Sequence, residues 1–190
     1  MKKTVTLSIL FAALFAMLSC SGKSNAQSSG DGSNKTAVYY FSATGTTKAA
    51  AQRIAKLINS DIIEIVPQEL YTDEDLDWRD SLSRSSVEMK DSLSRPALSE
   101  SIKSAENYDT IFIGYPNWWN TAPRIINTFI EASNLDGKVV VPFMTSGGSN
   151  ITNSENELHA AYPSIQWKKG LLMNNVSNEE IKSWIQQAGK

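Results

Sequence analysis

The sequence predicts an α/β protein in three layers, with a five-stranded parallel sheet doubly wound by helices on both faces. Unbroken apolar runs, such as residues 36–41 and 138–147, are typical of strands buried on both faces of a parallel sheet. Segments with apolar residues at helical spacing alternate with these runs, and this alternation indicates successive βαβ units. For five strands wound in this way, the expected order is 2-1-3-4-5.

The predicted elements follow one another in regular order. Strands are expected at residues 36–41, 61–66, 109–116, 138–147 and 170–173. Helices are expected at residues 47–60, 121–133, 153–162 and 177–189. Thr121 is a candidate N-cap, with Pro123 in the first turn of its helix. Ser177 and Glu180 have the spacing of a capping box, and Gly189 is expected to end the last helix.

The segment 67–104 is long for a connection and carries the sequence DSLSR twice, at residues 80–84 and 91–95. In a helix, two copies at this spacing would share a face. We interpret the repeat as a chance echo in a surface segment, and leave open that the segment borders a ligand site.

The N-terminus predicts a signal peptide over residues 1–19. Lysines precede an apolar run that is too short for a membrane span and ends in MLSC at Cys20, the only cysteine. This end resembles a bacterial lipobox, so Cys20 is the expected lipidation site and the protein is expected to be exported and anchored to a bacterial membrane. Two alternatives stay open: cleavage after Ala26, which would give a soluble periplasmic protein, and an incidental cysteine.

A Ser-, Gly- and Asn-rich stretch follows the lipobox. We predict that residues 20–35 form a flexible tether and that residues 36–190 form the folded domain. With 18 basic and 20 acidic residues, the chain offers no support for binding nucleic acid. One cysteine and one histidine, His159, give no metal-binding constellation, and His159 is expected on a solvated helix face.

The loop at residues 42–47 follows the first predicted strand and opens the first helix. Backbone N–H groups at such a helix start bind anions, and hydroxyl groups add further donors. The loop holds Gly45 among four hydroxyl residues, Ser42, Thr44, Thr46 and Thr47. It lacks the glycine and lysine pattern of a nucleotide-triphosphate loop, so it suits a terminal phosphate monoester. The alternative is that Thr46 or Thr47 only caps the helix.

Three stretches carry a resemblance to a known family. YYFSATGTTKAAAQRIA resembles the FMN phosphate loop of flavodoxins, although Thr46 stands where that family commonly has Asn. GYPNWWNTAP and PFMTSGGSN are similar to the two flavodoxin loops that embrace the flavin ring. The resemblance covers residues 36–188 and is closest to short flavodoxin-like proteins with a G-Y-P-x-W-W segment.

The resemblance implies an FMN site at the carboxyl ends of the strands. The phosphate would be held by Ser42, Thr44, Gly45, Thr46 and Thr47. The ring would be framed by Pro116, Asn117, Trp118, Trp119, Asn120, Thr145, Ser146, Gly147 and Gly148. Aromatic faces and flexible glycine backbone suit a flat, mostly apolar ring. We expect one of the adjacent tryptophans to pack inside and the other to meet the flavin, without assigning them.

Three functions are compatible with this resemblance. The first is electron transfer at a membrane surface, with a redox partner protein or a small-molecule electron acceptor. The second is an FMN-dependent NAD(P)H reductase of quinones or nitro compounds, and the third is a flavin-binding lipoprotein without redox function. Whether the protein is an enzyme is therefore left open, and no catalytic side chain is predicted.

Overall fold

The computed structural model describes residues 35–100 and 102–189. The predicted signal peptide, the lipidation site Cys20 and residues 20–34 of the predicted tether lie outside the described residues.

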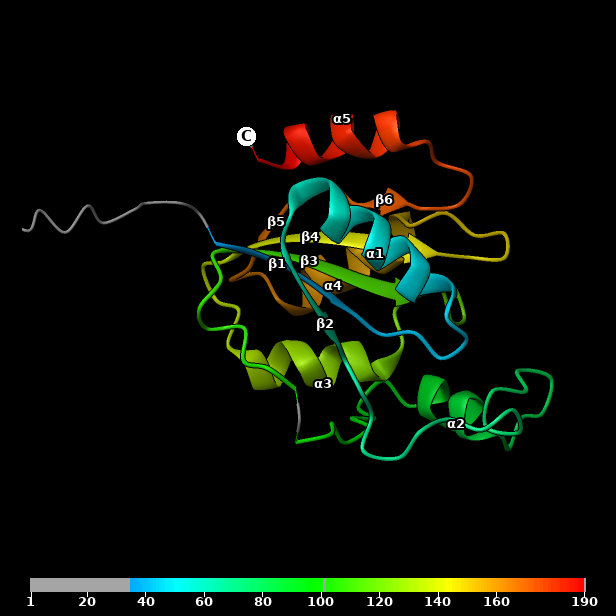
Figure 1. The fold of residues 1–190 in the computed structure, drawn as a ribbon. Coiled ribbons are helices and arrows are strands. Elements are labelled where there is room, and N and C mark those ends of the chain that lie inside the picture. Colours follow the sequence, from blue (N-terminus) through cyan, green and yellow to red (C-terminus); the bar gives the residue numbers. More distant parts are fainter. Residues whose placement is uncertain (1–34, 101, 190) are drawn as a thin grey trace, which may run out of the picture. The chain divides into compact units, whose positions relative to one another are not determined.

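A parallel sheet forms the centre of the described domain (Figure 1). Its strand order is β2-β1-β3-β4-β5, with parallel pairing throughout, so the predicted fold class is confirmed. The main strands are β1 (Thr36–Tyr40), β2 (Asp61–Glu64), β3 (Thr110–Pro116) and β4 (Val139–Thr145). The order places the ends of β1, β3 and β4 side by side at the carboxyl edge, where doubly wound sheets bind ligands.

The last edge of the sheet differs from the prediction. Two short strands, β5 (Gln166–Trp167) and β6 (Leu171–Leu172), both pair with β4. Only β6 was predicted, because a pair of residues is too short to show strand periodicity. Between these two strands, the Gly170 amide donates to a Glu155 carboxylate oxygen at 2.6 Å, so the strand pairing with β4 is interrupted there.

Helices cover both faces of the sheet and bury two separate cores (Figure 1). On one face, α1 (Thr46–Ile58) and α5 (Asn178–Ala188) pack on alternate residues of the strands. On the other face, α3 (Arg124–Ser133) and α4 (Thr152–Ala161) pack on the remaining strand residues. This two-sided burial explains the unbroken apolar runs in the sequence.

The helix ends test the predicted caps. The capping box of α5 is confirmed, since Ser177 accepts from the Glu180 amide at 3.2 Å and the Glu180 carboxylate accepts from the Ser177 amide at 2.8 Å. Gly189 ends this helix as expected. The predicted cap of α3 is wrong: its N-cap is Pro123, and the Thr121 hydroxyl instead donates to Glu157 at 2.6 Å.

The connection 67–104 contains one short helix, α2 (Arg84–Lys90). The two DSLSR copies lie before and after this helix and do not share a helical face. Each copy forms the same turn, in which the aspartate accepts from the leucine amide, Asp80 from Leu82 at 2.9 Å and Asp91 from Leu93 at 2.8 Å. The repeated sequence therefore encodes a repeated turn.

His159 does not lie on a solvated helix face as predicted. Its ring stacks on Trp167 with centroids 5.0 Å apart, and its Nε2 is buried. The histidine therefore packs α4 against the short strand β5, which the sequence did not reveal.

Candidate functional site

The loop between β1 and α1 leaves the start of its helix without a side-chain cap. Gly45 is the N-cap, with a φ of 87°, and within residues 35–100 and 102–189 the helix start has no side-chain cap hydrogen bond. The alternative that Thr46 or Thr47 caps the helix is therefore wrong. The Gly45 amide donates to the Ser42 hydroxyl at 3.1 Å, and Thr44 and Thr46 are exposed. Hydroxyl and amide donors are thus available to an anion at this helix start.

Thr47 connects this loop to the end of β4. Its side chain is buried, and its Oγ1 lies 2.7 Å from Oγ1 of Thr145. The structure thus brings together two predicted site residues that are 98 positions apart in the sequence. Their hydroxyl groups satisfy each other in the interior, so the two loops are held at a fixed separation.

The loop after β3 is a tight turn built on Trp119 and Asn120. Both residues have positive φ, 48° and 65°, and Trp118 and Thr121 exchange backbone hydrogen bonds of 3.0 Å on either side. Two such residues are typical of a type I′ turn, in which a tryptophan is uncommon. The turn leaves the Trp119 side chain 47% exposed at the edge of the sheet.

The two tryptophans of this loop have different surroundings. Trp118 lies edge-on to Phe41, with centroids 5.5 Å apart, and edge-on to Tyr71, with centroids 5.3 Å apart. Trp119 makes no such ring contact among the described residues and is largely open. Trp118 is therefore the packing residue of the pair, and Trp119 is the one available to a ligand.

The loop after β4 is organised by Ser146. Its hydroxyl accepts from the Gly148 amide at 3.1 Å and from the Ser149 amide at 2.8 Å. Its backbone amide donates to the Asn174 side chain at 2.9 Å, and the Asn174 amide donates back to its carbonyl. Gly147 and Gly148 are exposed, with open space where a side chain would begin. Asn174, which sequence reasoning missed, therefore fixes the position of this loop.

Asn117 carries an unpaired group between the second and third loops. Its backbone amide donates to the Thr145 carbonyl at 2.7 Å, whereas its side-chain Oδ1 is buried and has no hydrogen-bond partner in the described part of the chain. A buried acceptor of this kind costs free energy unless a ligand donates to it. The N–H edge of a flavin ring is such a donor, so an open phosphate loop, an exposed tryptophan and an orphan acceptor together fit FMN.

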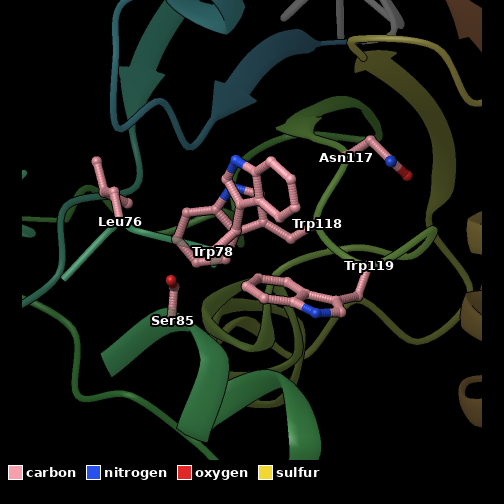
Figure 2. A pocket seen from close by; sticks show the side chains of 6 residues that line it. All are labelled: Leu76, Trp78, Ser85, Asn117, Trp118 and Trp119. Atoms are coloured by element: carbon pink, nitrogen blue, oxygen red, sulfur yellow. The ribbon is translucent and has the colours of Figure 1, made fainter. Parts of the chain in front are cut away.

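A cavity of about 290 Å³ lies beside these loops (Figure 2). It is lined by Asn117, Trp118, Trp119 and by three residues of the 67–104 connection, Leu76, Trp78 and Ser85. The sequence did not predict these last three. The sequence feature that could have revealed this wall is the pair of large apolar residues Leu76 and Trp78 within an otherwise acidic stretch.

A network of polar contacts holds the connection 67–104 beside the site. Tyr71 donates to the Glu88 carboxylate, which also accepts from Arg84 Nε at 2.7 Å. The Arg84 guanidinium lies 4.1 Å from the centre of the Tyr71 ring. Burial and the hydrogen bond to Glu88 raise the pKa of Tyr71 well above its ordinary value.

A family model for flavodoxin matches residues 35–188. The chain belongs to the flavodoxin family. Among curated proteins, no flavodoxin or other relative matches it.

Solved structures of similar proteins agree with this family. A protein from Bacteroides uniformis, described as a flavoprotein, is 56% identical with a TM-score of 0.77, covering 80% of this chain and 98% of its own. Another from Bacteroides eggerthii is 49% identical with a TM-score of 0.77, and the match covers 82% of this chain and 98% of the other. A flavoprotein from Lactobacillus acidophilus, in complex with FMN, is 23% identical with a TM-score of 0.64, covering 80% and 99%, and shares the fold.

Two further observations apply to residues 35–100 and 102–189. Within these ranges, no group of three or more His, Cys, Asp or Glu side chains is arranged to hold a metal ion. No helix of this part of the chain is both long enough and apolar enough to cross a membrane.

Proposed function

We propose that this flavodoxin-family protein transfers electrons through bound FMN at a membrane surface outside the cytoplasm. The observation that carries the proposal is the meeting of three loops, far apart in the sequence, at the carboxyl ends of β1, β3 and β4. The redox partner would be a protein or a small electron acceptor.

FMN, the predicted cofactor, is supported by membership of the flavodoxin family. The Lactobacillus acidophilus flavoprotein that shares the fold was solved in complex with FMN. When bound, FMN accepts and releases electrons singly or in pairs. In our proposal Ser42, Thr44, Thr46 and the first amides of α1 hold its phosphate. Asn117 Oδ1 then accepts from the polar edge of the ring, and Trp119 covers one face.

The side chains of this site support electron transfer more than acid–base catalysis. The predicted site residues carry hydroxyl, amide, indole or apolar side chains, or none in the case of glycine, and none ionises near neutral pH. Their work is therefore to bind and orient the cofactor and to keep water from its inner face. Electron transfer needs no more than this from the protein.

A second function, an FMN-dependent NAD(P)H reductase of quinones or nitro compounds, is favoured by one observation. The cavity between Trp119 and the 67–104 connection is open beside the proposed ring position and could admit a substrate. Stepwise reduction of the FMN-loaded protein, followed by addition of NADH or NADPH, separates the two functions. A carrier is reduced in two resolved one-electron steps and does not oxidise either nucleotide, whereas steady turnover with a quinone would contradict the carrier and support the reductase.

The proposed location depends on Cys20. A lipid on this cysteine, followed by the tether, would hold the domain close to the membrane surface. We expect Cys20→Ala to move the protein from the membrane fraction to the soluble fraction of cells. If the parent protein is already soluble, the anchor is absent and cleavage near Ala26 becomes the better explanation.

A further inference from the structure

Ser85 is a buried serine whose backbone amide is paired and whose hydroxyl is not. Its side chain is 2% exposed, and its Oγ makes no hydrogen bond among the described residues. Two neighbouring buried serines are satisfied, because Ser83 Oγ donates to Ser86 Oγ at 2.9 Å and accepts from the Ser86 amide. A buried hydroxyl without a partner is unfavourable, so an atom that binds in the adjoining cavity could supply the missing partner.

The cavity beside Ser85 is walled mainly by aromatic rings (Figure 2). Figure 2 shows the Ser85 hydroxyl directed toward the indole of Trp78, with the Trp119 ring beside it. The Asn117 amide lies on the far side of the tryptophans from Ser85. Both residues line the cavity, and Ser85 is the unpaired polar group of the two that the proposed FMN site does not use.

The aromatic walls indicate the shape of the ligand. Trp78 is 72% exposed and Trp119 is 47% exposed, which is unusual for such large apolar side chains. Indole faces bind flat rings by stacking. A volume of about 290 Å³ suits a small ring system and is too small for a whole dinucleotide.

The outer rim of the cavity indicates the charge of the ligand. Beyond Trp78 lies a hollow whose charged lining residues are Asp73, Glu74, Asp77 and Arg79, and Arg79 already pairs with Asp77 at 2.9 Å. The remaining carboxylates repel anions. Nicotinamide dinucleotides carry a charged pyrophosphate, so this rim disfavours them.

We propose that this cavity binds an uncharged, planar aromatic molecule with an acceptor oxygen, of the quinone or nitroaromatic kind. The Ser85 hydroxyl donates to that oxygen, and Trp78 and Trp119 hold the ring. The molecule lies beside FMN and does not replace it. The inference rests on the reductase alternative of the proposed function and gives its substrate a binding site. Because this site is formed by side chains of the protein, binding to the FMN-free protein is expected as well.

The test is calorimetric titration of the purified protein with 1,4-naphthoquinone, in FMN-free and FMN-loaded forms. We expect binding in both forms and several-fold weaker binding of 1,4-naphthoquinone-2-sulfonate, which carries an added sulfonate group and with it one negative charge. Equal binding of the two probes would overturn the role of the acidic rim. If the quinone bound to the FMN-free form but not to the FMN-loaded form, the flavin ring itself would fill the cavity, and the proposal would be overturned.

Variants of Ser85 and Trp78 separate binding from folding. Ser85→Ala is expected to weaken quinone binding by about three- to tenfold, the loss of one hydrogen bond, without lowering the melting temperature or the FMN affinity. Ser92→Ala, at an exposed serine, is the matched control. Trp78→Ala should lose most of the binding, whereas Leu82→Ala, at an exposed apolar residue outside the cavity, should retain it. Unchanged quinone affinity in Ser85→Ala, or reduced FMN affinity, would contradict the assignment.

Discussion

Gly45 and Thr47 determine the first loop in different ways. Gly45 adopts a left-handed backbone that other residues reach only at a cost, which lets the amides of α1 point outward without a cap. Thr47 turns inward and bonds to Thr145. One residue therefore shapes the opening of the loop, and the other fixes its distance from β4.

We predict that Gly45→Ala destabilises the protein through backbone strain alone. A Cβ at this position would meet no atom within 4 Å, so crowding is not the cause. The expected loss is about 1–2 kcal/mol in the free energy of unfolding, measured in urea. The control is Gly147→Ala, which also has open space but no positive φ, and should change stability by less than about 0.5 kcal/mol. Equal effects would contradict the strain.

The Thr47–Thr145 contact predicts non-additive mutations. Thr47→Val leaves the Thr145 hydroxyl buried without a partner, at a cost of about 1–3 kcal/mol, and Thr145→Val does the reverse. The double variant should lose clearly less than the sum, because neither hydroxyl remains. The exposed Thr46→Val serves as control. Simple additivity in urea unfolding would mean that the two hydroxyl groups do not interact.

At the scale of elements, the connection 67–104 depends on side-chain contacts more than on regular structure. It contains one short helix, yet Arg84 binds Glu88, the Glu69 carbonyl at 2.9 Å and the face of Tyr71. These contacts position Trp78 and Ser85 at the cavity.

We predict that Arg84→Lys loosens this connection, because lysine keeps the charge but loses the planar fork. Limited proteolysis should cut the variant within residues 67–104 several-fold faster than the parent. Arg79→Lys is the matched control, since Arg79 is exposed and its guanidinium pairs with Asp77 of its own turn. Identical cleavage rates for both variants would show that Arg84 does not hold the segment.

A second contact ties the same connection to α3 and gives it a pH dependence. Arg95 Nη2 donates to Glu131 at 2.8 Å, and hydrogen bonding to Arg95 lowers the pKa of Glu131 in the folded state. Its stabilisation is thus present above the ordinary carboxyl pKa, about 4.3, and is lost as pH falls through the lowered folded value. We expect Glu131→Gln to show a smaller drop in melting temperature on acidification, compared with the exposed Glu100→Gln. A drop as large as in the parent would contradict this.

The sequence predicted those elements whose own residues determine them. Apolar runs such as residues 36–41 require burial on two faces, and Ser177 with Glu180 forms a cap within four residues, so both follow from local pattern. Thr121 is not the cap because its backbone N–H and C=O are hydrogen-bonded to Trp118 across the tight turn at Trp119 and Asn120. β5 was missed because its pairing with β4, and not its two residues, makes it a strand.

At the scale of the whole molecule, the site is the meeting of three predicted loops and one wall that was not predicted. The loops follow from the topology, since the ends of β1, β3 and β4 are adjacent in this sheet. The wall formed by Leu76, Trp78 and Ser85 comes from contacts between distant segments, for which the sequence has no periodic signal.

The most direct test of the central claim is an absorption titration of the purified protein with FMN and, separately, with riboflavin. If the three loops form an FMN site, FMN saturates the protein at micromolar concentration with a shifted flavin spectrum. Riboflavin then binds more weakly, because it lacks the phosphate that the first loop holds. No spectral change with FMN would contradict the site, and equal affinity for the two flavins would contradict the role of residues 42–47.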